Sequence, residues 1–441
     1  MKPPSLDEKV DLSLPNKVVG PSVTESPQAW SIPLRTVFLL WVITLFDPHI
    51  WLSNYVGLIV RQIPAFIYLA LGVMIVASPK PRASYPPLLL FMTYAVVSIP
   101  FAENIGRTYA LVLKVLLLYC ILAFGSLTFV TNVNRMMVLI QLFLWQFPWW
   151  SFHANFGGFV PWHPDSGNED SFGPLMVMGL AYSFYYALAA NHRRLRWTAF
   201  FVSGLCLVGV VSSFARGAVL ATGFVVAYAW YRSPRKLRTL AILAVGAALF
   251  LIAANTLFPP GHFWSEMATI SEATTSDSDL DRWRLWKIAW RAFLDRPIFG
   301  VGAGNFGVYA YEHLWSDPEL MLYYQRGALW GRPTHNIYFQ WLSELGLIGI
   351  IAFVWLLLDF WYRNAELRSV PFITAWSATG QRFDLHMLSL GLEAAMVAYL
   401  TTGLFYDQFF IHWFYSLLTL NALLHFNTKR LALQQRPQTS Q

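Results

Sequence analysis

Residues 237–257 read LRTLAILAVGAALFLIAANTL, an apolar run whose only charged side chain is Arg238. A helix needs roughly 20 mostly apolar residues to cross the hydrocarbon core of a bilayer. Comparable runs recur from residue 36 to residue 426, and hydrophobic residues make up 56% of the 441-residue chain, against 12% charged residues. A water-soluble protein of this composition would expose large apolar patches. The sequence therefore predicts an all-α, polytopic membrane protein.

Twelve apolar runs approach the length of a spanning helix. They lie at residues 36–53, 61–78, 85–102, 109–130, 136–152, 172–190, 197–213, 217–231, 237–257, 336–361, 386–406 and 407–426. No polar block between them is long enough for a second core, so we expect one membrane domain over residues 31–428. The proline-rich residues 1–30 cannot bury enough apolar surface to fold alone. They are expected to be a disordered cytoplasmic tail, with a second cytoplasmic tail at residues 429–441.

The distribution of basic residues predicts the orientation of the spans. With the N-terminus inside, the inner connections and the C-terminal tail carry Lys80, Arg82, Arg135, Arg193, Arg194, Arg196, Arg232, Arg235, Lys236, Arg238, Arg363, Arg368, Arg382, Lys429, Arg430 and Arg436. The short outer connections carry only Arg61, Arg107 and Arg216. Because cytoplasmic loops are enriched in lysine and arginine, both termini are predicted to be cytoplasmic.

Cysteine usage and net charge exclude several classes of protein. Cys120 and Cys206 each lie inside an apolar run, so neither a disulfide framework nor a zinc site is expected. The net charge of +7 would suggest nucleic acid in a soluble protein. Here most of the basic residues sit in short loops between spans, so we expect no nucleic acid partner.

Two outer segments are too polar to span the membrane, residues 153–171 and the long loop at about 258–335. Long loops are commonly functional. The shorter one contains His163, Asp165, Glu169 and Asp170, which could bind sugar hydroxyls or a cation. Their irregular spacing carries no metal signature, and a solvated loop is the favoured interpretation.

Residues 281–294 of the long loop predict an amphipathic helix at 100° per residue. One face carries aromatic and aliphatic side chains, namely Trp283, Trp286, Trp290, Phe293 and Leu294. Its edge carries Arg284, Lys287 and Arg291. The pattern suits a helix lying in the membrane interface with its aromatic face in the acyl chains. It suits equally a helix packed on the transmembrane bundle with a solvated basic edge.

The segment GVGAGNFG follows, with a G-x-G-x-x-G spacing at Gly302, Gly304 and Gly307. A dinucleotide site is not expected, because no βαβ unit surrounds the motif. The glycines instead predict a tight turn with positive φ, or a close approach of the backbone to a ligand.

Arg216 in VVSSFARGAVLA lies at the outer mouth between two predicted spans, where topology alone disfavours a cation. A guanidinium presents a planar fork of donors that matches phosphate oxygens and keeps its charge. Arg216 is therefore a candidate for binding a phosphorylated group. The structural alternative is a snorkelling arginine that anchors the helix end.

His335 lies where the long loop enters the span 336–361, with Thr334 predicted as the helix N-cap. The positive end of a helix dipole disfavours imidazolium, so His335 is a candidate general base. A structural histidine is the alternative. Glu344 falls on the opposite face of the helix and is not expected to orient His335. Gly346 shares the His335 face and predicts close packing of another helix.

These segments resemble the Wzy_C or O-antigen ligase superfamily of bacterial membrane glycosyltransferases. The resemblance rests on SSFARGA around Arg216, on DRWRLWKIAWRAFLDRPIFGVGAGNF, and on THNIYFQWLSELGLIG from Thr334. It covers roughly residues 205–355. Family members usually have a serine directly before the arginine, where this chain has Ala215, with Ser212 and Ser213 further back.

The resemblance implies transfer of a glycan from an undecaprenyl diphosphate carrier to an acceptor hydroxyl, at the periplasmic face of the bacterial inner membrane and without metal or nucleotide cofactor. It makes Arg216 the diphosphate-binding arginine and His335 the histidine near the acceptor. We add Arg282, Arg284, Lys287 and Arg291 as further cations for the diphosphate. The partners implied are the lipid-linked donor, a glycan or lipid A core acceptor, and membrane lipids.

The sequence does not separate a ligase from a polymerase or a protein O-glycosylating enzyme, and the modest outer loops favour a ligase. A transporter or a flippase of lipid-linked oligosaccharides is the alternative from another class. Such proteins tend to show internal repeats and charged residues near the bilayer midplane. No convincing repeat is present, and few charges occur in the middle of a predicted span beyond Lys114 and Glu393. Polar residues concentrate at the outer rim, which favours chemistry over passage.

Overall fold

The computed structural model describes residues 30–434 apart from ten short gaps. The gaps are at 80–84, 114–116, 157–167, 234, 258–260, 269–276, 314–328, 370–373, 377–381 and 408–410. The described part is almost entirely helical, with one antiparallel pair of three-residue strands, β1 (Thr374–Trp376) and β2 (Arg382–Asp384). Residues 1–29 and 435–441 of the predicted tails lie outside it, while the last helix continues past residue 429 to Gln434.

The N-terminal half is a series of apolar helices joined by short connections. In chain order they are α1 (Ile32–Phe46), α2 (Pro48–Val56), η1 (Leu58–Gln62), α3 (Ile63–Ala77), α4 (Pro86–Val97), η2 (Ile99–Phe101), α5 (Ile105–Leu111), α6 (Leu117–Phe129), α7 (Val133–Phe156), α8 (Asn168–Ala189) and α9 (Arg193–Ser212). Asp47 and Pro48 interrupt the first predicted span, as expected, because Asp47 is left-handed and a proline begins α2.

The C-terminal half contains the long loop and the helices on either side of it. These are α10 (Arg216–Arg232), α11 (Lys236–Thr256), α12 (His262–Ala268), α13 (Asp277–Asp295), α14 (Phe306–His313), α17 (Ile337–Ser369), α18 (Leu385–Thr402) and α19 (His412–Gln434). Each of the twelve predicted spans contains at least one helix. Six helices of the described part are long and apolar enough to cross a membrane. The chain is a multi-pass membrane protein, and the count of twelve spans stays a prediction.

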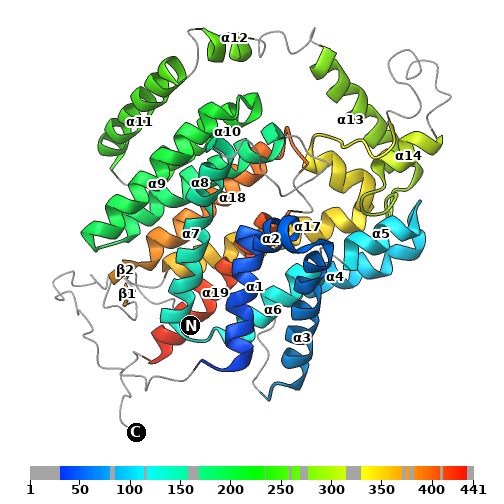
Figure 1. The fold of residues 1–441 in the computed structure, drawn as a ribbon, viewed down its shortest axis with the longest axis horizontal. Coiled ribbons are helices and arrows are strands. Elements are labelled where there is room, and N and C mark those ends of the chain that lie inside the picture. The colour runs from blue at the N-terminus through cyan, green and yellow to red at the C-terminus, as the bar shows by residue number, and fades with distance from the viewer. Residues whose placement is uncertain are drawn as a thin grey trace, which may run out of the picture.

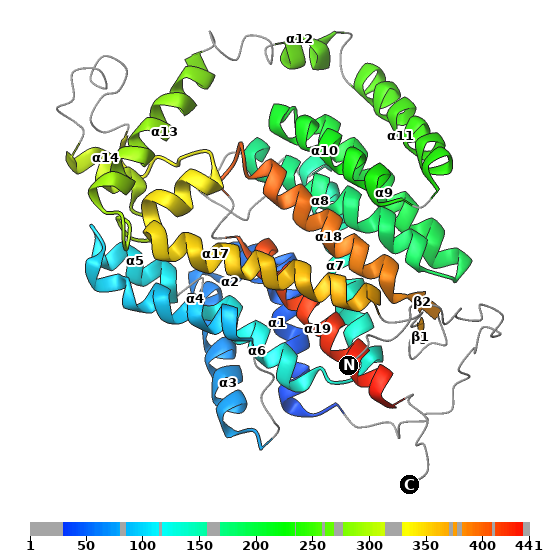
Figure 2. The same cartoon turned by 180° about the vertical axis from the view of Figure 1, so that it is seen from behind.

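Helix α18 runs through the middle of the bundle (Figures 1 and 2), where it contacts α8, α10, α17 and α19. Helix α8 packs between α9 and α18, and α17 also contacts α4 and α13. At the edge of the bundle, α3 and α11 present apolar side chains outward, including Leu69, Val76, Leu237 and Val245, each more than half exposed. Exposed rows of this kind are stable when lipid is the solvent.

Connections predicted to lie on the same side of the membrane group together. At one end of the bundle, Asn191 N donates to Arg382 O and Arg430 Nη1 donates to Thr131 O. At the other end lie the start of α10, the approach to α17 and the turn of residues 403–407 after α18. We call this the site end, and the end that carries Asn191, Arg382 and Arg430 the far end. Which end faces the cytoplasm stays a prediction.

Helix α17 contains a sharp kink at Gly346, where φ is 61° and ψ is −164°. A Cβ built there would lie 2.6 Å from both Gly300 N and Ile298 O. Gly346 therefore admits the loop that follows α13, and the prediction that it admits another helix was wrong. The loop fits because its own glycines turn sharply: Gly300, Gly302 and Gly304 all have positive φ, which confirms the tight turn predicted for Gly302 and Gly304. Gly307, the third glycine of the predicted spacing, lies in α14 and instead permits a close approach of the backbone of Gly331 and Arg332.

The Gly346→Ala substitution is expected to lower the free energy of unfolding by about 1–3 kcal/mol, since its backbone region is essentially restricted to glycine. Thermal unfolding in detergent, followed by tryptophan fluorescence, measures the loss. Gly246→Ala on α11 is the matched control, because a Cβ there meets nothing within 4 Å. Equal melting temperatures for the two variants would contradict this role of Gly346.

Candidate functional site

The turn of residues 403–407 holds the start of α17 at the site end of the bundle. Ile337 N donates to Gly403 O at 2.8 Å, and Asn336 Nδ2 donates to Leu404 O at 3.0 Å. Asp407 Oδ1 accepts from Asn336 N at 2.8 Å and from Thr334 Oγ1 at 2.7 Å. Residues on both sides of His335 are therefore fixed to the turn.

The N-cap of α17 is Asn336, and the prediction of Thr334 as the cap was wrong. Asn336 Oδ1 accepts from Tyr338 N at 2.9 Å and from Phe339 N at 3.1 Å. An asparagine caps a helix start as well as a threonine does, and the threonine hydroxyl here bonds to Asp407 instead. His335 thus lies outside the helix, just before its cap.

His335 has a left-handed backbone with φ of 52°, between the buried residues Thr334 and Asn336. Its own side chain is partly exposed. Positive φ in a residue other than glycine is uncommon and costs free energy, and it persists where neighbouring contacts fix it. The hydrogen bonds to the turn supply those contacts, so the imidazole sits at a rigid, partly open position.

Arg216 is the first residue of α10 and follows a turn of three residues after α9. Phe214 in that turn also has positive φ, at 52°. The hydroxyl of Ser213 accepts from Ala215 N at 3.2 Å and donates to Val210 O at 2.8 Å. The serine nearest Arg216 therefore stabilises the backbone of the turn.

The same turn after α18 contacts the Arg216 segment. A Cβ built on Gly217 would lie 2.7 Å from Phe405 Cβ, so the glycine permits Phe405 to pack directly on the first turn of α10. Residues 403–407 thus touch the neighbours of Arg216 on one side and of His335 on the other. The two candidate residues lie at the same end of the bundle, on segments joined by one short turn.

Helix α13 approaches this region through Trp286. Its Nε1 donates to Thr334 O at 3.1 Å, and its ring stacks on Phe339 with centroids 5.4 Å apart. At 100° per residue, Arg282 shares the face of Trp286. Arg284 and Arg291 fall on the opposite face. Of the four predicted secondary cations, Arg282 is thus placed best relative to the His335 segment.

The packing face of α13 differs from the predicted aromatic face. Leu285, Ile288, Ala289 and Ala292 are buried in a cluster with α14 and its surroundings. Trp283, Trp290 and Leu294 are each about half exposed. The helix therefore packs on the protein by one face and leaves tryptophans open on another. That these tryptophans lie in the membrane interface stays a prediction.

An apolar groove of about 750 Å³ lies between α13 and α17. It is lined by Trp283, Trp286, Lys287, Trp290, Tyr338, Phe339, Trp341, Leu342, Ile350, Phe353, Val354 and Leu357. Lys287 is its charged residue. Because Trp286 and Phe339 also contact each other beside Thr334, the groove begins next to the His335 segment.

Glu344 of α17 hydrogen-bonds to the loop that contains Gly300, Gly302 and Gly304. Its carboxylate accepts from Gly304 N at 2.8 Å and from Phe306 N at 3.2 Å. Glu344 is buried, and its carboxylate faces this loop. It therefore does not face His335, as the helical spacing predicted. Of the acidic outer loop, His163 and Asp165 lie outside the described residues, as do the side chains of Glu169 and Asp170.

Residues 201–354 match the family model Wzy_C, whose description is O-antigen ligase. The match covers about a third of the chain, and this region is similar to the O-antigen ligase family. A curated relative is the teichuronic acid biosynthesis protein TuaE of Bacillus subtilis (strain 168), which is 24% identical over 277 residues. The alignment covers 58% of this chain and 50% of the relative, so the chain spans about half the length of that protein.

The matched region includes Arg216, α13 and His335 and ends before the turn of residues 403–407. Asp407 in that turn was missed by the sequence analysis. The signal available was weak: a single aspartate in GLFYDQFF, between two apolar runs. Its importance depends on contacts with Thr334 and Asn336, which lie about 70 positions earlier in the chain.

Asp407→Ala is expected to loosen the segment before α17. The substitution removes an acceptor from a buried backbone N–H, which costs about 1–3 kcal/mol. Amide hydrogen exchange of residues 334–339 should accelerate by roughly 5- to 150-fold, measured by mass spectrometry on the protein in detergent.

Asp384→Ala is the matched control, because Asp384 also accepts from two backbone amides, those of His386 and Met387, at the start of α18. It should accelerate exchange at residues 385–388 and leave residues 334–339 unchanged. Unchanged exchange at residues 334–339 in the Asp407 variant would show that Asp407 does not stabilise the segment before α17.

Proposed function

We propose that this protein is an inverting glycosyltransferase that moves a glycan from undecaprenyl diphosphate to an acceptor hydroxyl, without a metal ion, at the periplasmic face of the bacterial inner membrane. The observation that carries the proposal is the turn of residues 403–407, which contacts the segments of both Arg216 and His335. The match of residues 201–354 to the O-antigen ligase family model and the similarity to the teichuronic acid biosynthesis protein support a role in polysaccharide biosynthesis.

In the proposed step, His335 takes the proton of the acceptor hydroxyl. The acceptor oxygen forms a bond to the anomeric carbon from the side opposite the leaving group, so the configuration inverts. The bond from that carbon to the diphosphate oxygen breaks, and its electron pair leaves with undecaprenyl diphosphate. A positioned general base of this kind contributes typically 10²- to 10⁴-fold in rate.

Negative charge accumulates on the departing diphosphate, and Arg216 is assigned to stabilise it. Preorganised cations aimed at developing charge lower the barrier because they need no rearrangement during the reaction. Arg216 is the first residue of α10, so the positive end of the helix dipole adds to its charge. Of the four secondary cations predicted, Arg282 and Lys287 are proposed as further contacts, whereas Arg284 and Arg291 lie on the opposite face of α13.

The groove between α13 and α17 supports a lipid-linked donor. Its lining is apolar and aromatic, it begins beside the His335 segment, and Lys287 is its cation. A polyprenyl chain in this groove would place its diphosphate end near the segment that carries the proposed base. The exposed tryptophans of α13 are the type of residue enriched at the membrane interface.

Ligase and polymerase remain alternatives within this proposal, and protein O-glycosylation is a third choice of acceptor. We favour a ligase. Analysis of the surface polysaccharide of a deletion strain discriminates, because loss of a ligase leaves long carrier-linked chains, while loss of a polymerase leaves single repeats.

A flippase is the alternative from another class. It would use charged groups inside the bundle to pass a substrate. Glu393 is only 1% exposed and is already engaged by two arginines. Purified protein in proteoliposomes, supplied with undecaprenyl-diphosphate-linked glycan, acceptor and EDTA, should form a glycosidic product without nucleotide. Translocation of the donor without product would overturn the enzymatic proposal.

A further inference from the structure

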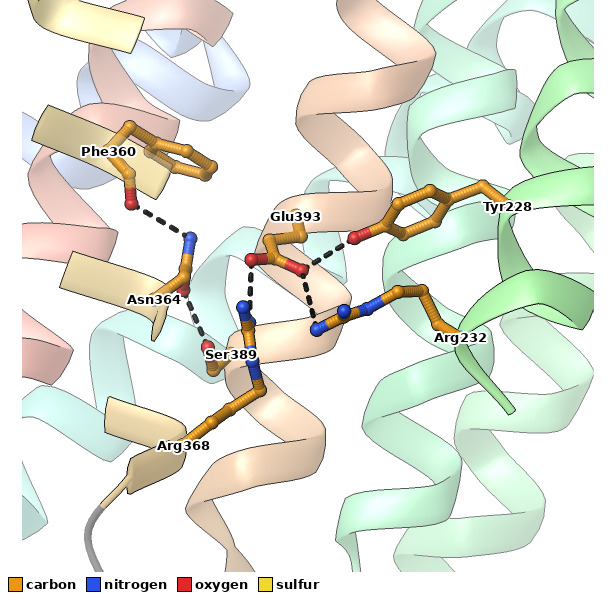
Figure 3. A network of polar contacts seen from close by, with 7 residues as sticks. All are labelled: Tyr228, Arg232, Phe360, Asn364, Arg368, Ser389 and Glu393. Carbon is orange, nitrogen blue, oxygen red and sulfur yellow. Dashed lines mark hydrogen bonds and ion pairs between the residues drawn. The ribbon is translucent and has the colours of Figure 1, made fainter. Parts of the chain in front are cut away.

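A buried carboxylate ties three helices together toward the far end of the bundle (Figure 3). Glu393 on α18 is 1% exposed. Its Oε1 accepts from Arg368 Nη1 on α17 at 2.6 Å, and its Oε2 accepts from the Tyr228 hydroxyl on α10 at 2.5 Å. Arg232 Nη2, also on α10, lies 3.6 Å from Oε2. Both carboxylate oxygens are thus engaged, one by each neighbouring helix.

The two helices tied by Glu393 are those next to the proposed reacting groups. Arg232 is the last residue of α10, and Arg216 is its first. Arg368 lies at the end of α17, which begins two residues after His335. At 1.5 Å per residue, the 17-residue α10 carries Arg216 roughly 24 Å from Arg232. In α10 a contact at one end therefore constrains the other end. In α17 the loop after α13 bonds to both sides of the kink at Gly346, through Ser343 O and Glu344 O before it and Leu347 N after it, so the two parts of this helix are held in a fixed relation.

Helix α18 contacts α10 and α17 toward both of its ends. Toward the far end the contact is the Glu393 carboxylate. At the site end it is the turn that follows α18, through Phe405 against Gly217 and through Gly403 and Leu404 to the segment of Asn336. With two points of attachment on each side, α10 and α17 cannot tilt independently about α18.

A second polar contact links α17 and α18 close to the first. Ser389 Oγ donates to Asn364 Oδ1 at 2.6 Å, and Asn364 Nδ2 donates to Phe360 O at 3.2 Å (Figure 3). Loss of the Glu393 charge would thus leave α17 partly fastened to α18. The larger change is expected at α10, whose attachments to Glu393 come from Tyr228 and Arg232.

We infer that Glu393 is a positioning residue, which fixes the relative tilt of α10 and α17 and with it the spacing of Arg216 and His335. This inference rests on the proposed function for its effect on activity, but not for its effect on geometry. Removing the charge leaves two arginines near an uncharged partner in a largely buried place, which favours rearrangement of the helices that carry them.

Glu393→Gln is expected to reduce kcat roughly 10- to 100-fold, because a displacement of about 1 Å far from the chemistry can cost 100-fold. KM for the lipid-linked donor should change much less, since Arg216 and the groove remain. Glu393→Asp keeps the charge and should retain more activity than Glu393→Gln.

Asp359→Asn is the matched control. Asp359 Oδ2 lies 2.6 Å from Arg363 Nε, and the two side chains are 18% and 7% exposed. This ion pair lies within α17, and Arg363 also lies over the rings of Tyr85 at the start of α4 and Phe426 of α19. The control removes a carboxylate charge of α17 whose arginine partner lies outside the Glu393 cluster, so its kcat should stay near that of the wild type.

A distance measurement tests the geometry without any activity. Spin labels on Leu220→Cys of α10 and Leu347→Cys of α17 occupy exposed positions, whereas the native cysteines Cys120 and Cys206 are buried. Pulsed electron spin resonance should give a shifted or broadened distance distribution for Glu393→Gln and an unchanged one for Asp359→Asn.

If Glu393→Gln does not insert or fold, the double variant Tyr228→Phe/Arg232→Gln serves instead, because it removes both attachments of α10 and leaves the Arg368 contact in place. An unchanged distance distribution in the charge-loss variant would overturn the inference, whatever its activity. If Arg216→Ala and His335→Asn both remain active, the proposed function fails. The distance result would still decide the role of Glu393 in helix geometry.

Discussion

Arg216→Ala is expected to reduce glycan transfer by about 100-fold or more, the usual cost of removing a donor aimed at developing charge. The residue begins α10, so its removal leaves the buried contact of Gly217 with Phe405 intact, and the protein should still insert and fold. Initial rates with purified protein in proteoliposomes, at saturating acceptor, measure the effect.

Two comparisons sharpen this test. Arg216→Lys keeps a positive charge but loses the planar fork, so it should recover only part of the rate. Arg61→Ala removes another arginine of the predicted outer connections, on an exposed residue of η1, and should leave the rate unchanged. Near-normal transfer by Arg216→Ala would count decisively against the assigned role.

His335→Asn is expected to reduce kcat by roughly 10²- to 10⁴-fold, the range that a general base contributes. Asparagine is preferred to alanine for this test, because it tolerates the left-handed backbone found at this position better than other residues do. The substitution removes the basic nitrogen and keeps the local fold.

The donor should still bind to His335→Asn, because Arg216 and the groove are unchanged, so KM for the donor should differ little from the wild type. His386→Asn, at the start of α18 and the far end of the bundle, is the matched control. Wild-type kcat in His335→Asn would reject a base at this position. Loss of donor binding together with kcat would instead assign the histidine to the donor.

Part of the candidate site followed from residue types alone. An arginine at the outer mouth of a span, a histidine at the entrance of another, and a basic aromatic helix between them are unusual in a membrane chain, and this is why they could be selected. The glycines at 302 and 304 likewise predicted positive φ, because few other residues adopt it.

Other features depended on partners far away in the chain. Asn336 rather than Thr334 caps α17, because Asp407, more than 70 positions later, bonds to the Thr334 hydroxyl. The buried face of α13 could not be chosen from periodicity, since two of its faces are apolar and only the contacts with α14 and α17 select one. Gly346 admits a loop rather than a helix for the same reason.

The sequence by itself determined that this chain is a helical membrane protein. Its apolar runs are long enough to span a bilayer, and within lipid a helix satisfies all the backbone hydrogen bonds of such a run. It also supplied the charged and polar residues at the loop ends. Only the tertiary structure decided that one turn after α18 joins the segments of Arg216 and His335, and that Glu393 ties the same two helices at their other ends. Those relations are contacts between distant residues, which hydrophobic periodicity and local propensity do not encode.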